Sequence, residues 1–309
     1  MQLSTENRIA LFLFALLVAV VLSSIPLYSA DETGYTIRSS ANEVRLAFAA
    51  SDRQGHVIKA LHSSDVAVAD NGSIIRQFRS FRSASESPLD LVVLLDASDS
   101  VASQIPAEIA EVTNFIEDST WGERDRVSIL AFGGLRPQLL CARNCRGEAA
   151  QVKLSALRAN GATPLYDALL QASEILQENR DSESRPAMVL FSDGIDTISM
   201  HSASDALQAA QNLQSAIYSV NSRSRKSSAG KGDVILDYLA ASTGGLSFGP
   251  GQDVAAALRM ILDDLHSGYV LTYVLPQQTV GQHTVRILPT SDPKLQFRSR
   301  RAYDDRGDE

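Results

Sequence analysis

The sequence predicts an α/β protein with a doubly wound, mostly parallel sheet flanked by helices, and with an additional small β module made of N- and C-terminal strands. Two observations predict this arrangement. Between residues 89 and 268, short apolar runs typical of buried strands alternate with segments of helical periodicity, as in parallel sheets covered by helices. On both sides of this region, strand-like segments follow one another without helices between them.

The central region begins with an apolar run at residues 91–95 that contains no polar side chain, which is typical of a strand buried on both faces. The expected order is strand 89–95, helix 105–116, strand 127–132, helix 165–177, strand 188–191, helix 203–213, strand 217–220, helix 235–241, strand 246–248 and helix 254–265. Right-handed crossovers then bring the carboxyl ends of the strands to one edge of the sheet.

The flanking segments, 31–88 and 269–309, have the composition of β-strands. Residues 66–78 contain the turn Asp70-Asn71-Gly72 between two apolar stretches, which predicts a hairpin. Strand-like stretches near residues 44–50 on one side, and at 269–274, 281–287 and 295–300 on the other, are expected to pair with one another. The chain then ends in a charged tail.

Residues 1–30 are typical of an export segment. A continuous apolar run from Ile9 to Leu22 follows Arg8, and small and polar residues lead to Ala30, as in a secretory signal peptide. If it is not cleaved, its length approaches that of a single-pass membrane anchor. Either form places the rest of the protein outside the cytoplasm, in the periplasm or the extracellular space or anchored to the inner membrane.

Composition agrees with a folded protein and excludes one class of partner. The chain has 309 residues, of which 44% are hydrophobic and 21% charged, as in ordinary globular proteins. The formal net charge of −8 and the lack of a basic stripe interleaved with aromatic residues argue against nucleic-acid binding.

Polar residues interrupt the pattern at three places that the topology brings together. Asp96, Ser98 and Ser100 follow the first buried strand, Thr163 precedes a helix, and Asp193 follows another strand. Ligands of open α/β sheets bind at this edge, and an all-oxygen set without His or Cys suits Mg²⁺, Mn²⁺ or Ca²⁺. Each break alone could also be a helix cap or a turn.

The series Asp96-x-Ser98-x-Ser100, Thr163 and Asp193 resembles the metal-ion-dependent adhesion site (MIDAS) of von Willebrand factor type A domains, which have a Rossmann-like fold. The resemblance covers residues 89–268. It implies that Ser98, Ser100 and Thr163 are metal ligands, whereas Asp96 and Asp193 hold waters and neutralise charge. It also implies that a partner carboxylate completes the coordination.

A second resemblance extends over the flanks. A segment like Ser51 to Gly72, followed at the other end by a Gly268-Tyr269 strand, is similar to a bacterial subfamily of secreted or anchored von Willebrand factor A-related proteins, seen especially in acidobacteria.

The two cysteines, Cys141 and Cys145, are expected in a surface excursion after strand 127–132. A disulfide is plausible in an oxidising compartment, and free thiols are the main alternative. A redox-catalytic pair is least favoured.

These observations favour an exported binding protein, not an enzyme. A cation held by neutral hydroxyls keeps an open position and positive character, which suits capture of an Asp or Glu from a partner protein. The alternatives are an envelope scaffold whose loops the metal stiffens and, less favoured, a metal-dependent hydrolase. None of the five His lies in a metal motif, and no G-x-S-x-G, H-E-x-x-H or phosphate loop occurs.

Overall fold

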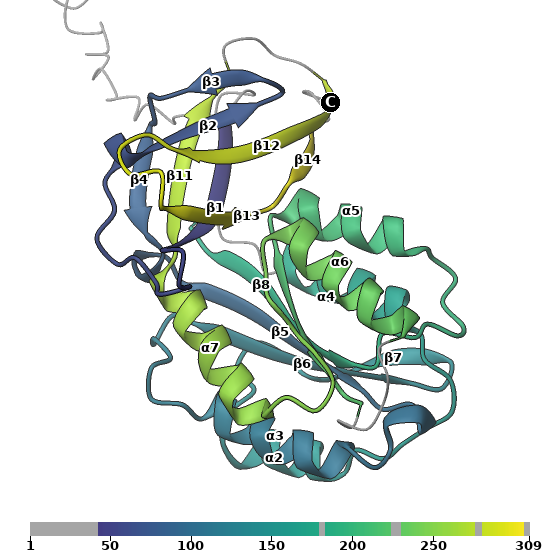
Figure 1. Ribbon diagram of the computed structural model, residues 1–309. Coiled ribbons are helices and arrows are strands. Elements are labelled where there is room, and N and C mark those ends of the chain that lie inside the picture. Colours follow the sequence, from purple (N-terminus) through teal and green to yellow (C-terminus); the bar gives the residue numbers. More distant parts are fainter. Residues whose placement is uncertain (1–42, 179–182, 224–229, 276–279, 306–309) are drawn as a thin grey trace, which may run out of the picture. The chain divides into compact units, whose positions relative to one another are not determined.

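The computed structural model describes residues 43–178, 183–223, 230–275 and 280–305 (Figure 1). The expected export segment, residues 1–30, lies outside the described residues. Within the described ranges, no helix combines the length and the apolar composition needed to cross a membrane.

The α/β part is built on a six-stranded sheet with the strand order β10-β9-β8-β5-β6-β7. Five strands are parallel, and β7 runs antiparallel to β6 at one edge, so the predicted doubly wound, mostly parallel sheet is confirmed. All eight residues of the central strand β5 are buried, as expected for a parallel strand covered on both faces. The strands are β5 (Leu89–Asp96), β6 (Arg126–Gly133), β7 (Arg136–Cys141), β8 (Arg185–Ser192), β9 (Ala216–Asn221) and β10 (Ser247–Phe248).

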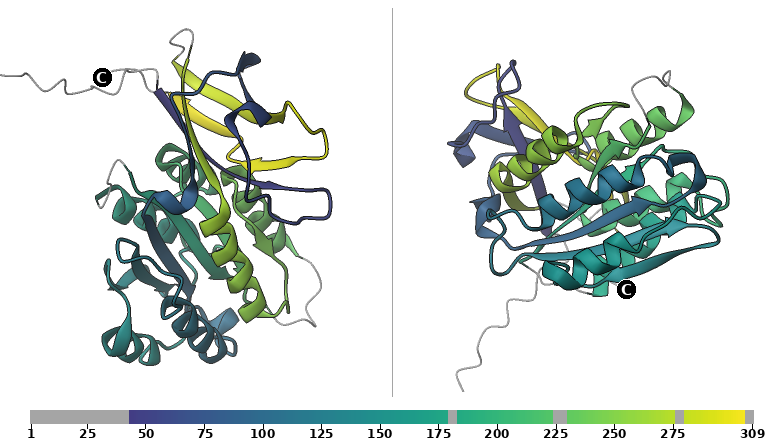
Figure 2. Two further views of the ribbon diagram at one scale, coloured as in Figure 1. Left: turned by 90° about the vertical axis from the view of Figure 1, so that its left-hand side faces the viewer. Right: turned by 90° about the horizontal axis from the view of Figure 1, so that it is seen from below.

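Helices cover both faces of this sheet (Figures 1 and 2). One apolar core joins it to α2 (Ile105–Ile116), α3 (Gly147–Ser155) and α7 (Val254–Ser267). A second core joins the opposite face to α4 (Leu165–Glu178), α5 (Ala203–Leu213) and α6 (Lys231–Thr243). The alternating side chains of β5, β6, β8 and β9 therefore enter two different cores, which explains the unbroken apolar runs in the sequence.

The sequence pattern did not predict β7 and α3 in the α/β part, nor the short strands at residues 80–83 and 302–305 outside it. Strand β7 is a half-exposed edge strand that contains Pro137, so it lacks the apolar run of a buried strand. Helix α3 buries only Ala150 and Leu154, which leaves almost no amphipathic signal. Helix α6 also starts earlier than expected, at Lys231 instead of Ile235, because its first turn is polar and Asp233 accepts a hydrogen bond from Gly230 N.

The flanking segments form two antiparallel four-stranded sheets, in the orders β13-β1-β11-β4 and β14-β12-β2-β3. N-terminal strands pair with C-terminal strands in both sheets, β1 with β11 and β2 with β12, as the sequence predicts. The strands are β1 (Glu43–Ser51), β2 (Val66–Asp70), β3 (Ser73–Ile75), β4 (Ser80–Ser83), β11 (Tyr269–Val274), β12 (Gly281–Pro289), β13 (Gln296–Ser299) and β14 (Ala302–Asp305).

The predicted hairpin joins β2 to β3. Its two central residues, Asn71 and Gly72, both have positive φ angles, 44° and 83°. Two-residue turns of this kind match the twist of the flanking strands and favour Asn-Gly.

A buried polar network ties the two antiparallel sheets together. Asp70, at the end of β2, is only 1% exposed. Its Oδ2 accepts hydrogen bonds of 2.6 Å from Tyr273 in β11 and from Tyr303 in β14, and its Oδ1 lies 2.6 Å from Nδ1 of His283 in β12. Burial, reinforced by the contact with Asp70, raises the pKa of both tyrosines, so they remain donors.

The last strands also contact the α/β part. Arg300, 6% exposed, donates to the backbone oxygens of Gln211 at 3.1 Å and Arg45 at 3.0 Å. Arg298 pairs with Asp264 in α7, which also accepts a 2.6 Å hydrogen bond from Tyr218 of β9. The C-terminal strands are thus joined by charged hydrogen bonds to α5 and α7 of the α/β part.

Replacement of Asp70 by Ala is expected to lower the free energy of unfolding by about 3 kcal/mol, since it leaves buried donors without an acceptor. Urea unfolding followed by circular dichroism measures the change. Glu123→Ala, at an exposed position, is the control and should change stability by less than about 0.5 kcal/mol. A loss below about 1 kcal/mol for Asp70→Ala would contradict a dominant role of the network.

Asp90, the second residue of β5, is buried without a hydrogen bond to either carboxylate oxygen from the described residues. Burial raises its pKa to about 6, against the opposing effect of Arg126 and Arg143. Well below pH 4 the group is protonated in folded and unfolded chains alike. Between pH 4 and 6 the folded state binds more protons than the unfolded state, so stability falls as the pH rises through this window.

Asp90→Asn is therefore expected to leave stability unchanged at pH 4 and to increase it at pH 8, by up to about 3 kcal/mol for a pKa raised from about 4 to about 6. Denaturant unfolding of both proteins at the two pH values tests this. Equal stability of wild type and Asp90→Asn at pH 8 would contradict this expectation. It would show that other interactions in the folded protein offset the cost of burying the ionised Asp90 carboxylate.

Candidate metal centre

Three loops at the carboxyl edge of the sheet carry the residues that the sequence singled out. Asp96 ends β5, Ser98 directly precedes the short 3-10 segment Asp99–Val101, and Ser100 lies within that segment. Thr163 lies two residues before α4, and Asp193 follows β8 directly. All of them except Ser100 are buried.

The first loop folds back on the end of its own strand. Ser98 N donates a 2.9 Å hydrogen bond to Asp96 Oδ1, and the hydroxyls of Ser98 and Ser100 lie 3.0 Å apart. The two hydroxyls are therefore close enough to share one ligand. Asp99 N donates to the Gly161 carbonyl at 3.0 Å, which attaches this loop to the one that carries Thr163.

Asp96 is also held by a residue that the sequence analysis did not assign to the site. Ser192, the last residue of β8, is fully buried and donates a 2.7 Å hydrogen bond to Asp96 Oδ2. The Ser192 hydroxyl accepts a 3.0 Å bond from Gly194 N. In the sequence, the feature that could have indicated this role is the position of Ser192 immediately before Asp193.

The loop after β8 supports the Thr163 loop. Thr163 N donates to Thr197 Oγ1 at 2.7 Å, and Thr197 N donates to the Thr163 carbonyl at 3.0 Å. Asp196 accepts a 2.9 Å hydrogen bond from Leu165 N at the start of α4. Asp196 therefore caps α4 from a different loop, so this cap depends on a tertiary contact.

Close backbone packing fixes Asp193. A Cβ atom at Gly232, in the first turn of α6, would lie 2.0 Å from the Asp193 carbonyl oxygen, and one at Gly194 would lie 2.3 Å from the Gly232 carbonyl. Gly194 also has a φ of 76°, a conformation that favours glycine. The start of α6 thus presses directly against the carboxylate loop.

The site concentrates negative charge in a buried place. Burial raises the pKa of Asp96, the charge of Asp193 raises it further, and hydrogen bonds from Ser98 and Ser192 oppose the rise. A third carboxyl group, Glu108 of α2, is 4% exposed. Its pKa rises to about 7, chiefly through burial and also through the charge of Asp96. Buried carboxylates that lie close to other carboxylates favour a cation.

The donor set fits a hard divalent cation. The hydroxyls and carboxylates of the five assigned residues offer oxygen alone, which suits Mg²⁺, Mn²⁺ or Ca²⁺ and disfavours zinc. In the described part of the chain, no three His, Cys, Asp or Glu side chains gather into a metal-binding group. Any cation at this edge would therefore depend on the hydroxyls of Ser98, Ser100 and Thr163.

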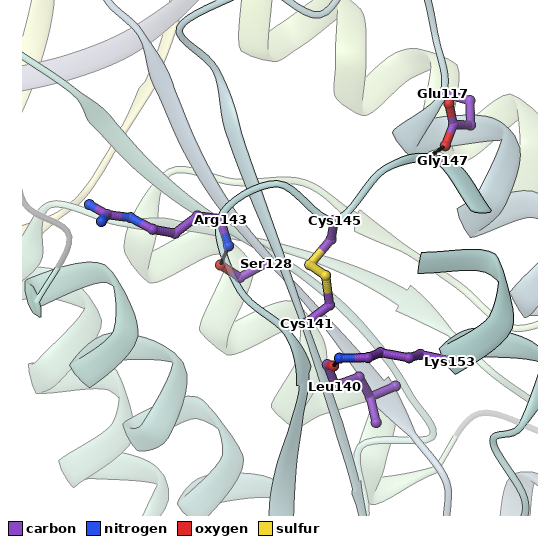
Figure 3. The surroundings of a disulfide bond; sticks show 8 residues. All are labelled: Glu117, Ser128, Leu140, Cys141, Arg143, Cys145, Gly147 and Lys153. Atoms are coloured by element: carbon purple, nitrogen blue, oxygen red, sulfur yellow. Dashed lines mark hydrogen bonds between the residues drawn. A yellow bond between two sulfur atoms is a disulfide. The ribbon is translucent and has the colours of Figure 1, made fainter. Parts of the chain in front are cut away.

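The cysteines lie apart from these loops, where β7 ends (Figure 3). Cys141 and Cys145 form a disulfide with a Cα–Cα distance of 5.6 Å, within the usual range. Arg143, between them, donates its N–H to Ser128 Oγ at 2.9 Å, and Lys153 of α3 donates to the Leu140 carbonyl at 2.6 Å. The bridge closes a tight loop against β6.

Gly232→Ala is expected to lower the free energy of unfolding by about 1–3 kcal/mol, since the new methyl group must displace the Asp193 backbone. Thermal or urea unfolding measures the loss. Gly249→Ala is the matched control, because nothing lies within 4 Å of a Cβ at that position. Equal stability of the two variants would contradict the tight contact at Asp193.

Comparisons with solved structures find similar chains at low sequence identity and with TM-scores below 0.5. An aerotolerance-related membrane protein from Bacteroides fragilis is 14% identical, with 57% of this chain and 98% of that chain covered and a TM-score of 0.45. BatB from Bacteroides thetaiotaomicron is 12% identical, with 57% and 96% covered and a TM-score of 0.45. Proximal thread matrix protein 1 from the mussel byssus is 14% identical, with 63% and 51% covered and a TM-score of 0.49.

No curated protein sequence matches the chain. A family model does match it, over residues 91–195, and its description is von Willebrand factor type A domain. This range contains Asp96, Ser98, Ser100, Thr163 and Asp193. Residues 91–195 of this protein therefore match the von Willebrand factor type A domain, in the part of the α/β sheet that carries the candidate metal centre.

Proposed function

We propose that this protein is an exported, metal-dependent protein-binding module of the adhesion type. In this proposal Ser98, Ser100 and Thr163 bind a Mg²⁺ ion, or Mn²⁺ or Ca²⁺, and Asp96 and Asp193 hold its waters and neutralise its charge. The observation that carries the proposal is that the hydroxyls of Ser98 and Ser100 lie 3.0 Å apart, in the loop that follows the buried Asp96. A backbone hydrogen bond attaches this loop to the loop that carries Thr163.

The chemistry of the donors favours capture of an acidic partner. Neutral hydroxyl ligands leave a divalent cation with net positive charge, and a hard cation completes its shell with oxygen. A carboxylate from another protein supplies both the missing oxygen and the missing negative charge. Members of the von Willebrand factor type A family are generally protein-interaction modules, which agrees with this role.

Exposed apolar side chains near the site support a protein partner. Leu135 is 79% exposed, and its neighbour Gly134 donates a hydrogen bond to the Ala162 carbonyl, next to Thr163. Met200 is 92% exposed and donates its N–H to Asp167 in the first turn of α4. Exposed large hydrophobic side chains beside these loops would offer apolar contacts to a bound protein.

The proposed location rests on the apolar segment of residues 9–22 and on the disulfide between Cys141 and Cys145. Disulfides persist in oxidising compartments such as the periplasm and the extracellular space. We therefore place the protein there, secreted or anchored through its N-terminal segment, as in the bacterial von Willebrand factor A-related subfamily that the sequence resembles.

Two other functions remain as alternatives. An envelope scaffold would use the cation only to stiffen the loops, and a hydrolase would need a base within reach of a metal-bound water. In the scaffold, removal of the metal lowers the melting temperature without affecting any partner. In the adhesion module, removal of the metal abolishes partner binding while the fold persists.

Calorimetric titration of Mg²⁺ and Mn²⁺ into the chelator-treated protein tests the site. We expect binding by the wild type and a loss of at least tenfold in affinity for Asp96→Ala and Ser98→Ala, since each change removes a donor from the set. Ser103→Ala, at an exposed serine just beyond the turn, is the matched control and should bind like wild type. Absence of binding by the wild type, or equal binding by all variants, would refute the proposed centre.

A further inference from the structure

An open groove lies between helix α6 and the C-terminal strands. Its volume is about 680 Å³. Hydrogen bonds join its two walls: Arg301 N donates to the Ser242 carbonyl in α6 at 3.2 Å, and the Arg298 guanidinium of β13 donates to the Gly244 carbonyl directly after α6. The helix and the strands that form the groove are therefore held together by the fold itself.

Positive charge gathers in this groove, although the whole chain carries a formal net charge of −8. Among the described residues, its lining includes Arg286 of β12, Arg298 and Arg301, against one carboxylate, Asp237. Arg298 is paired with Asp264 of α7, whereas the ion pairs of the described arginines involve neither Arg286 nor Arg301. Both of these arginines are exposed, so two guanidinium groups are available to an anionic ligand.

Apolar side chains continue the groove along α6. Val234 is 68% exposed and Tyr238 is 50% exposed. Together with Ala241, which lines the groove, they have the i, i+4, i+7 spacing of one helical face. The half-buried side chains of Leu246 and Phe297 also line the groove. Because aromatic residues and arginines are enriched in protein interfaces, this combination favours a protein segment as the ligand.

We propose that the groove is a second binding surface of this protein, which takes an acidic segment of a partner protein with apolar side chains beside its Asp or Glu residues. A guanidinium group can bind a carboxylate through two parallel hydrogen bonds. Arg286 and Arg301 would each bind one acidic side chain, while the exposed face of α6 and the apolar lining of the groove would contact the apolar ones.

This surface is separate from the candidate metal centre. Helix α6 packs against Asp193 through Gly232 in its first turn, whereas Ala241, nine positions later, lines the groove. At 1.5 Å per residue these two positions lie about 14 Å apart along the helix. Binding in the groove therefore requires no cation, and it can be measured with the metal removed.

Fluorescence anisotropy with the full chain and a labelled peptide of alternating Glu and Leu tests the groove, in the presence of a chelator and at low ionic strength. We expect wild type to bind this peptide more tightly than the same peptide with Gln in place of Glu, although the net charge of the protein opposes an acidic ligand. The double variant Arg286→Gln, Arg301→Gln should bind about 3- to 30-fold more weakly, as expected for the loss of two exposed ion pairs. Added salt should weaken binding by wild type.

Arg53→Gln is the matched control, since Arg53 is exposed and does not line the groove, and it should bind like wild type. Tyr238→Ser tests the apolar part and should also weaken binding. All of these positions are at least half exposed or fully on the surface, so the variants should unfold at the same urea concentration as wild type.

Three outcomes would overturn the inference. The first is absence of binding to the Glu-Leu peptide, or equal affinity of wild type and the double variant. The second is binding that occurs only without chelator and is lost in Asp96→Ala, which would assign the peptide to the metal centre. The third is a wild-type dimer in sedimentation that the double variant lacks, without peptide binding, which would show that a second copy of the chain fills the groove.

Discussion

Burial of β5 on both faces is the constraint on which the rest of the structure depends. Its eight residues are all buried, between one core formed with α2, α3 and α7 and another formed with α4, α5 and α6. A strand covered in this way has its backbone groups paired with β6 and β8, and only its ends can meet polar groups. Asp96 occupies one end, and the candidate site forms where the strand stops.

The loops around Asp96 are fixed by contacts between segments that are distant in the sequence. The Ser192 hydroxyl holds Asp96 from the neighbouring strand, Thr197 holds Thr163, and the first turn of α6 packs against Asp193 through Gly232. Such contacts hold oxygen donors in place before a ligand arrives, which reduces the ordering that binding would require. The negative charge left at the site and its oxygen-only donors explain why a hard cation is the ligand class that fits.

In the antiparallel sheets, too, contacts between segments that are distant in the sequence fix a buried polar group. Their apolar core is joined by one buried carboxylate, Asp70, which receives hydrogen bonds from both sheets. Arg298 and Arg300 then connect the C-terminal strands to α7 and α5 of the α/β part. Buried charges with several partners define a unique arrangement more strictly than apolar contacts, because each unsatisfied partner carries a large cost.

The sequence alone determined the features that depend on local pattern. The apolar run of β5, the alternation of strands and helices, and the Asn71-Gly72 turn are periodic or local signals, and each appears in the structure as predicted. The polar breaks at Asp96, Thr163 and Asp193 were visible because they end or precede such runs, and the parallel topology placed them at one edge.

Only the tertiary structure decided the features that depend on partners from elsewhere in the chain. The network of Asp70 joins residues 203 to 233 positions apart, and Ser192 reaches Asp96 across 96 positions. Arg286 and Arg301 show no local sign that they line one groove with α6, because only the packing of the C-terminal strands brings them there. Strand β7 and helix α3 were missed for the same physical reason: their stability comes from packing against β6 and α2, and their own sequences carry little periodicity.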